Sequence, residues 1–182
     1  MAAIMVSMTL RKNRLLDKIR INKGELVTLC SELVKIPSDN PPGDTSQLAA
    51  YIKDYLAERG ADTETYEPMK GVVNLVSSVG DGKPSLVLNG HLDQFPGDVG
   101  EKWNRPPHSG AIEDGHIHGR GSGDMKGGLA SLLFCFGLLV CEDMDGKLSF
   151  TGTSDEETGG RWGALWLLEN VGGLEGDAVL KG

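Results

Sequence analysis

The sequence is poor in cysteine and in aromatic residues. It holds 3 cysteines among 182 residues, and aromatic residues make up 5% of the chain. Cys30, Cys135 and Cys141 are odd in number and form no Cys-x-x-Cys pair, which argues against a structural zinc site made of thiolates. Cys135 and Cys141 also lie in an apolar stretch. We therefore predict that all three cysteines are reduced core residues.

Positive charge and long apolar runs are also scarce. The formal net charge of -8 argues against binding to nucleic acid or to an anionic membrane, because those partners require clustered Lys and Arg. No run approaches the ~20 apolar residues of a membrane-spanning helix. Residues 1–14 place their apolar residues before the basic ones, unlike a secretory signal. We therefore expect a frayed amino terminus and a cytoplasmic protein.

An ordinary balance of apolar and charged residues predicts a single folded domain. Hydrophobic residues make up 39% of the chain and charged residues 24%, which is typical of globular proteins. The length suits one domain over residues 1–182.

Alternating patterns along the chain predict an α/β domain. Periodicity and turn residues predict helices at 22–35, 45–60, 129–140 and 161–170. Short apolar or β-branched runs predict strands at 63–67, 72–77, 85–89, 111–112, 116–118, 147–153 and 177–180. The carboxyl ends of neighbouring strands bring together residues that are distant in sequence. Candidate functional residues are therefore expected directly after the strands.

His91 and Asp93 directly follow the predicted strand at 85–89. Their spacing of two places both side chains on one face if strand geometry persists. Asp93 can then orient His91 or lie over the same site. A surface histidine beside a surface aspartate is the alternative interpretation of this pair taken alone.

Asp124 lies in a glycine-rich segment, GRGSGDMKGG, that leads into a predicted buried helix. Glycine allows the backbone to approach a ligand closely. The segment lacks the spacing of a P-loop, and the acidic Asp124 disfavours a dinucleotide phosphate site. A cation held between this carboxylate and others explains the segment better than a bound phosphate.

Three adjacent acids, Asp155, Glu156 and Glu157, follow the predicted strand that precedes them. On an exposed turn their mutual repulsion costs little, which is one interpretation. At the end of a buried strand they can instead divide roles, one ligating a metal ion and another transferring protons. Together with His91 and Asp124, they suit Zn²⁺, Co²⁺ or Mn²⁺.

These motifs resemble the M20 family of metallopeptidases and amidohydrolases. The resemblance runs from about Glu25 to Gly182 through NGHLDQFP, KW…P…GAIEDGHIHGRGSGDMKGG and TSDEETGG, in the family's order and approximate spacing. It implies the amino-terminal part of a zinc-aminopeptidase-like catalytic domain, with a mixed, mostly parallel sheet flanked by helices. It also implies hydrolysis of an amide bond in an N-acyl amino acid or a small peptide, as in acetylornithine deacetylase or aminoacylase.

The resemblance implies a role for each candidate residue. His91 ligates one of two divalent ions, Asp124 bridges them and Glu157 ligates the second. Zinc is the expected metal, with cobalt and manganese as alternatives. Glu156 is the general base that takes a proton from a water shared by the ions, and Asp93 is a partner of the ligand histidine.

The sequence is expected to be a truncated form of such a hydrolase. In this family a further carboxylate and a further histidine ligand come downstream of a segment like the one that ends at Gly182. The family's lid or dimerisation domain is missing from the sequence, and the full-length form is expected to be a homodimer. The alternative to an active hydrolase is a catalytically silent fragment that binds metal weakly or not at all.

Other histidines and the tryptophans are expected to be structural. His108, His116 and His118 are candidates for the missing ligand positions, but the hairpin at 111–118 precedes the glycine-rich segment, which favours a structural role. The tryptophans are interpreted as packing residues, and they are Trp103, Trp162 and Trp166.

Overall fold

The computed structural model describes residues 2–97 and 102–182. In chain order the helices are α1 (Ala2–Ile21), α2 (Lys23–Lys35), α3 (Ser46–Ala57), α4 (Gly127–Leu139) and α5 (Trp166–Asn170). The strands are β1 (Thr63–Met69), β2 (Val72–Asp81), β3 (Ser85–His91), β4 (Ala111–Glu113), β5 (His116–His118), β6 (Gly146–Thr153) and β7 (Ala178–Lys181). The predicted alternation of strands and helices is thereby confirmed.

Five strands form the central sheet in the order β1-β2-β6-β3-β7, and β4 and β5 form a separate hairpin. Strand β3 pairs in parallel with β6 and β7, whereas β2 pairs antiparallel with β1 and β6. The predicted mixed sheet flanked by helices is confirmed. Parallel pairing is limited to two of the four strand pairs. A tight turn at Lys70-Gly71 joins β1 to β2, so these two strands are antiparallel.

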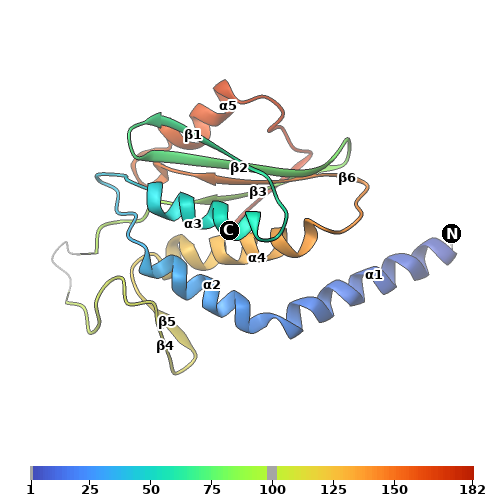
Figure 1. Cartoon of the computed structure of the whole chain (residues 1–182), viewed down its shortest axis with the longest axis horizontal. Coiled ribbons are helices and arrows are strands. Elements are labelled where there is room, and N and C mark those ends of the chain that lie inside the picture. The colour runs from blue at the N-terminus through green and yellow to red at the C-terminus, as the bar shows by residue number, and fades with distance from the viewer. Residues whose placement is uncertain (1, 98–101) are drawn as a thin grey trace.

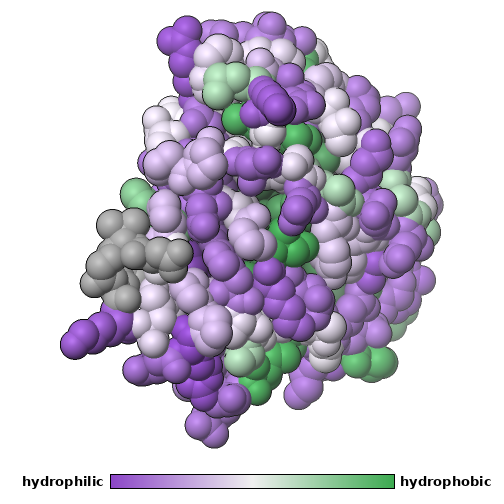
Figure 2. Space-filling view, turned by 60° about the vertical axis from the view of Figure 1, so that its left-hand side comes forward, coloured by the Kyte–Doolittle hydropathy of each residue, from purple (hydrophilic) through white to green (hydrophobic). Residues whose placement is uncertain are grey.

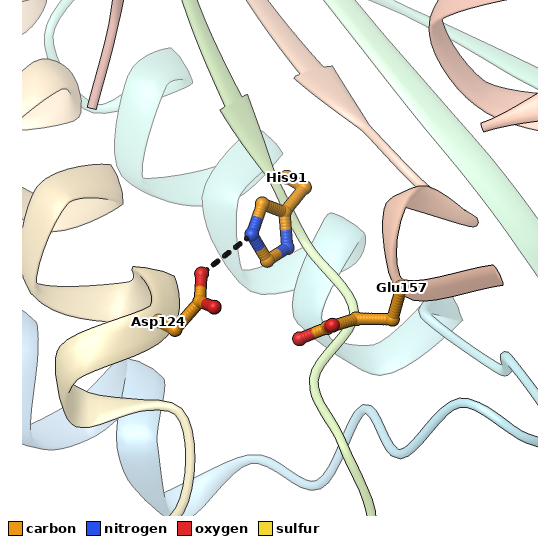
Figure 3. A group of neighbouring side chains, drawn as sticks. All are labelled: His91, Asp124 and Glu157. Atoms are coloured by element: carbon orange, nitrogen blue, oxygen red, sulfur yellow. Dashed lines mark hydrogen bonds and ion pairs between the residues drawn. The ribbon is translucent and has the colours of Figure 1, made fainter. Parts of the chain in front are cut away.

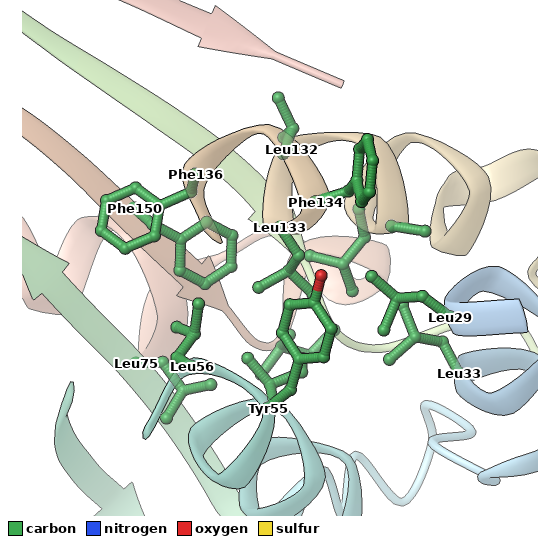
Figure 4. Close-up of a cluster of buried hydrophobic side chains, with 14 of the residues drawn as sticks. Leu29, Leu33, Tyr55, Leu56, Leu75, Leu132, Leu133, Phe134, Phe136 and Phe150 are labelled. Atoms are coloured by element: carbon green, nitrogen blue, oxygen red, sulfur yellow. The ribbon is translucent and has the colours of Figure 1, made fainter. Parts of the chain in front are cut away.

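Helices α2, α3 and α4 cover one face of the sheet, and α5 lies on the other (Figure 1). The main core fills the space between the three helices and the sheet (Figure 4). Helix α4 is apolar on nearly all sides because it lies between β3 and β6 on one side and α2 on the other. Leu133 of α4, Leu33 of α2 and Phe150 of β6 have 0% exposure.

The opposite face of the sheet has a much smaller core. Val76 of β2 packs there with Leu167 of α5 and Leu174. Beside this cluster an apolar pocket of about 210 Å³ reaches Val179 of β7. Residues alternate between the two faces along each strand, so Leu75 of β2 belongs to the main core while its neighbour Val76 belongs to the small one.

The amino terminus is helical, so the expectation that residues 1–14 fray is wrong for residues 2–14; Met1 lies outside the described residues. Helix α1 extends away from the rest of the domain (Figure 1). Ion pairs from Arg14 and Lys18 to Glu142, just beyond α4, attach it to the body of the domain. Within the described residues, no helix has the length and the apolar character needed to cross a bilayer.

The cysteines are all free, as predicted, but they are not all in the core. Cys30 is buried and Cys135 is half-buried. Cys141 is exposed, because it follows the end of α4, where the chain turns toward β6. Its assignment to the core is therefore wrong.

The predicted helix at 161–170 is regular only in its second half. Residues Arg161–Leu165 form a looser turn, η3, in which Gly163 has non-helical dihedral angles. A Cβ atom at Gly163 would lie 1.8 Å from the carbonyl oxygen of Ser154. The close approach of this turn to the end of β6 therefore requires glycine.

Candidate metal centre

The candidate residues come together at the carboxyl ends of β3 and β6. These parallel strands are in register, with His91 opposite Thr153, so the segment after β6 begins beside His91. Figure 2 shows the side of the molecule that lies at the left in Figure 1, where both strands end. Hydrophilic residues cover most of this side, and hydrophobic residues form separate small areas. The surroundings of the site are therefore polar.

His91 is buried, with 3% of its side chain exposed, and both ring nitrogens have oxygen partners. Nδ1 lies 2.9 Å from the carbonyl oxygen of Asp93, and Nε2 lies 3.0 Å from Oδ1 of Asp124. Since both partners are acceptors, each nitrogen must present a proton, or Nε2 must share a cation with the carboxylate. Burial, the largest single influence, lowers the pKa of His91, but hydrogen bonds to Asp93 and Asp124 outweigh it and raise the pKa to about 9.

Asp93 is fully buried and accepts hydrogen bonds from three directions. Its carboxylate accepts from Asn40 Nδ2 at 2.8 Å, from the Glu156 amide at 3.2 Å and from the Glu157 amide at 3.0 Å. Burial alone would raise the pKa of Asp93, but His91, Asn40 and these amides together lower it. Asp93 thus joins the end of β3, the loop after α2 and the turn after β6.

Asp124 lies on the turn η1 (Ser122–Lys126), in an extended conformation just before α4. Its side chain is 79% exposed, in contrast to that of His91. Gly121 precedes the turn with φ 76°, and a Cβ atom there would lie 2.5 Å from Oε1 of Gln94. The left-handed backbone conformation at this position therefore favours glycine.

Lys126 anchors the other end of this turn in the interior. Its side chain is fully buried, and Nζ donates to the carbonyl oxygen of Ile36 at 2.6 Å. Burial lowers the pKa of Lys126 to about 7, and nearby Asp39 partly opposes this shift. The contact joins the turn that carries Asp124 to the loop that carries Asn40.

The three acids after β6 have different environments. Asp155 accepts a hydrogen bond from the Trp162 amide at 3.0 Å and so faces away from the site. Burial, together with repulsion from Asp124, raises the pKa of Glu157. Glu156 is 40% exposed, and its Oε2 lies 4.0 Å from His91 Nε2. Because Asp155 points elsewhere, it adds little to the repulsion at the site. Glu156 and Glu157 are the two acids that remain there.

His91, Asp124 and Glu157 offer one ligand atom each, and these atoms all lie within 4.8 Å of one another. Figure 3 shows the three side chains converging from β3, from the turn before α4 and from the turn after β6. One imidazole nitrogen and two carboxylates form a donor set that fits Zn²⁺, Co²⁺ or Mn²⁺. The raised pKa of Glu157 also indicates that the site needs positive charge. The residues present therefore fit a divalent cation.

The remaining histidines lie outside this group. Within residues 2–97 and 102–182, His91, Asp124 and Glu157 make up the group of candidate ligands that the geometry brings together. Nε2 of His108 lies 3.7 Å from Oδ2 of Asp39, and Nδ1 of His116 lies 2.8 Å from the carbonyl oxygen of Asp114.

Three residues near the site were missed by the sequence-based prediction. Asn40 lies in a loop that the sequence shows only as a break between helices, and Lys126 looks like a surface lysine. Lys181 lies at the end of β7, and its Nζ donates to Oε1 of Glu156 at 2.9 Å. The sequence offered one indication of these contacts, which is the polar Asn40 next to two prolines. Nothing in the sequence indicated a role for Lys126 or Lys181.

Residues 87–181, just over half of the chain, match the sequence profile of peptidase family M20/M25/M40. The chain is 34% identical over 152 residues to N-formyl-4-amino-5-aminomethyl-2-methylpyrimidine deformylase of Halalkalibacterium halodurans, covering 80% of this chain and 36% of the relative. It is 34% identical over 149 residues to succinyl-diaminopimelate desuccinylase of Hydrogenovibrio crunogenus, covering 80% of this chain and 39% of the relative. The chain thus spans less than two fifths of these curated relatives.

Solved structures share the fold. The M20 family metallo-carboxypeptidase Sso-CP2 from Sulfolobus solfataricus is 26% identical with a TM-score of 0.75, covering 86% of this chain and 37% of that one. Human carnosine dipeptidase 1 superimposes with a TM-score of 0.76 at 22% identity, covering 93% of this chain and 40% of that one. At that identity the second likeness concerns the fold alone.

Proposed function

The chain belongs to peptidase family M20/M25/M40, and from this membership we propose that it carries the metal centre of a hydrolase that cleaves amide bonds. The convergence of His91, Asp124 and Glu157, with Glu156 beside them, is the observation that carries this proposal. The named relatives include a deformylase, a desuccinylase and a metallo-carboxypeptidase, all of which are hydrolases.

In the proposed site each residue has one task. His91 and Glu157 would each hold one of two divalent ions, Zn²⁺ in the first instance, and Asp124 would be a ligand to both. Bound divalent cations lower the pKa of water and polarise a carbonyl group. Asp93 keeps the imidazole in place through the contact between its carbonyl oxygen and Nδ1 of His91.

Glu156 is the proposed general base. Its Oε2 lies 4.0 Å from Nε2 of His91, so the carboxylate borders the site without taking the place of a ligand. It is 40% exposed and can therefore reach a water molecule at the mouth of the site. It accepts the proton of the attacking water and then gives it to the leaving nitrogen of the amide.

The proposed substrate is an N-acyl amino acid or a small peptide. The names of the relatives support this class, because a desuccinylase removes an acyl group from an amino acid and a carboxypeptidase cleaves a peptide. The proposed assembly of the whole protein is a homodimer.

A silent, weakly metal-binding chain is the second candidate, and the number of ligands favours it. The described residues bring together three ligand side chains. With Asp124 shared, each of two ions would have two protein ligands, whereas catalytic zinc sites usually present three.

Hydrolysis assays separate the two candidates. The chain loaded with Zn²⁺, Co²⁺ or Mn²⁺ is incubated with N-acetyl, N-formyl and N-succinyl amino acids and with dipeptides, and release of the free amine is measured. Turnover that is lost in the Glu156→Gln variant supports the proposed hydrolase. Metal binding without turnover supports the silent chain, and absence of metal binding in calorimetric titration contradicts the proposed metal centre.

A further inference from the structure

Lys181 places a positive charge at the metal centre. Its Nζ donates to Oε1 of Glu156 at 2.9 Å, and the other oxygen of the same carboxylate lies 4.0 Å from Nε2 of His91. The ammonium group is therefore separated from the ligand atoms by the width of one carboxylate. It comes from β7, two strands away from β6, whose end carries Glu156.

The strand register brings Lys181 to this position. Lys181 pairs with Asn89 of β3, two residues before the ligand His91. Val179, two residues earlier on β7, lines the pocket on the α5 side of the sheet, so Lys181 leaves the strand on that side. From there its long side chain crosses the end of β3 to reach the turn after β6.

The charge of the metal-free centre explains why this contact forms. Four carboxylates lie close together around the His91 ring. They belong to Asp93, Asp124, Glu156 and Glu157. The His91 ring lies between Asp93 and Asp124 and contacts both of them. Lys181 is an ammonium that faces these carboxylates from outside.

We infer that Lys181 is a built-in counter-ion of the metal centre, which stabilises the metal-free site and weakens the binding of divalent cations. The ammonium pairs with Glu156, beside the carboxylates of Asp124 and Glu157 that would hold a dication, so the two positive charges repel each other and each reduces the benefit of the other. This inference rests on the proposed function, since it concerns the same centre, and it adds a determinant of metal affinity.

The expected effect is modest, because the contact is accessible to water. The side chains of Lys181 and Glu156 are 56% and 40% exposed. Repulsion between an ammonium and a dication several ångströms apart in a water-like surrounding corresponds to about tenfold in affinity. Screening reduces this to about threefold near 0.1 M salt. We expect an affinity change between these limits.

Titration of metal into charge variants tests the inference. Zn²⁺ or Co²⁺ is added to the metal-free chain and to its Lys181→Met variant, and binding is followed by calorimetry and by the absorbance of Co²⁺. The variant should bind about three- to tenfold more tightly, and the difference should shrink as the salt concentration rises. In the absence of metal, the same variant should melt at a lower temperature than the wild-type chain.

Two further variants control for charge and position. Lys181→Arg keeps the charge and should bind metal like the wild-type chain. Lys83→Met removes a lysine that pairs with Asp177 at 3.1 Å, at the opposite end of β3 and about 20 Å from His91. It should change affinity by less than about twofold, since charges that far apart are screened.

The outcomes separate this inference from the proposed function. Wild-type binding with unchanged affinity in Lys181→Met overturns the counter-ion and leaves the metal centre intact. Binding by Lys181→Met but not by the wild-type chain upholds the counter-ion and contradicts a metal centre in the unaltered chain. If neither chain binds metal, both ideas are wrong.

Discussion

The metal centre has a buried half and an exposed half. His91 and Asp93, at the end of β3, have 3% and 0% of their side chains exposed. Asp124 and Glu156, on turns that border the strands, are 79% and 40% exposed. One half is thus part of the protein interior, while the other is part of the surface.

The two halves also differ in their hydrogen bonds. Asp93 accepts from Asn40 and from two backbone amides, so its position is fixed by three segments of the chain. Among the residues that the structure describes, the Asp124 carboxylate contacts His91 and has no such network. The comparison indicates that the fold organises the buried half in advance, whereas the exposed half depends on the cation to hold its carboxylates together.

Removal of the Asp93 carboxylate should have the largest effect on stability. The Asp93→Ala variant removes the acceptor of two backbone N–H groups and of one Asn40 hydrogen bond, and it removes a carboxylate that lies 3.6 Å from Nδ1 of the buried His91 ring. Loss of one partner of a buried charged network costs about 3–5 kcal/mol. Urea denaturation of the metal-free chain, followed by circular dichroism, measures this loss.

The same substitution in the exposed half is the matched control. Asp124→Ala should change the free energy of unfolding of the metal-free chain by less than about 1 kcal/mol, because exposed ion pairs contribute little. Equal losses of unfolding free energy in Asp93→Ala and Asp124→Ala would contradict the expectation that the buried half contributes more to stability than the exposed half.

Asp124→Ala should instead have the largest effect on metal binding. The substitution removes the carboxylate that lies 3.0 Å from Nε2 of His91 and that is the proposed shared ligand. Loss of a shared ligand should weaken affinity more than about 100-fold, beyond the range seen when a supporting partner of a ligand is lost. Calorimetric titration with Zn²⁺ measures the change. An affinity within tenfold of the wild-type value would exclude Asp124 as a shared ligand.

Metal affinity should rise with pH, because the buried half holds a proton that the metal must displace. Hydrogen bonds raise the pKa of His91 to about 9 in the metal-free chain. Below that pH, binding at Nε2 releases one proton, so affinity should increase by roughly tenfold per pH unit between pH 7 and pH 9. Titrations at pH 7, 8 and 9 test the slope, and a His91→Asn variant should lack it.

The same proton has the opposite effect on the metal-free fold. The pKa of His91 in the folded chain, about 9, lies above its ordinary value of 6.5. The stability that protonated His91 contributes is therefore complete below about pH 6.5 and is lost as the pH rises through about 9. A metal-free chain that is more stable at pH 9 than at pH 6 would contradict this assignment.

The fold and the convergence of the candidate residues were predictable because local patterns encode them. Apolar runs define β3 and β6. His91 at the end of β3 and Glu157 on the turn after β6 lie at the same sheet edge because the two strands are parallel. Asp124 was identified from its place before an apolar helix, which the structure confirms as α4.

The support of the site was less predictable because tertiary contacts determine it. Asn40 reaches Asp93 only because the loop after α2 pairs with the end of β3, through a bridge between Asp39 and Gln94. Lys126 is fully buried, against the usual preference of lysine, because a backbone carbonyl accepts its hydrogen bond. Neither contact has a signature in the periodicity of the sequence.

Asn40→Ala should reduce stability less than Asp93→Ala does and metal affinity less than Asp124→Ala does, and it tests how far the buried half depends on its support. Nδ2 of Asn40 donates to Oδ2 of Asp93 at 2.8 Å and to Oγ1 of Thr158 at 3.0 Å. A hydrogen bond to a charged group contributes about 1.5–3 kcal/mol, and the two remaining amide donors to Asp93 should keep the cost near the lower limit. Metal affinity should fall by about tenfold or less, since the ligands themselves stay in place.

An exposed asparagine provides the comparison for this last substitution. Nδ2 of Asn170 donates to the carbonyl oxygen of Trp166 at 2.8 Å on the surface of α5, away from the metal centre. Asn170→Ala should change neither metal affinity nor, by more than about 0.5 kcal/mol, stability. If Asn40→Ala behaves in the same way, the two backbone amides of the turn after β6 suffice to hold Asp93. The buried half would then be held in position by β3 and the turn after β6, without the loop that carries Asn40.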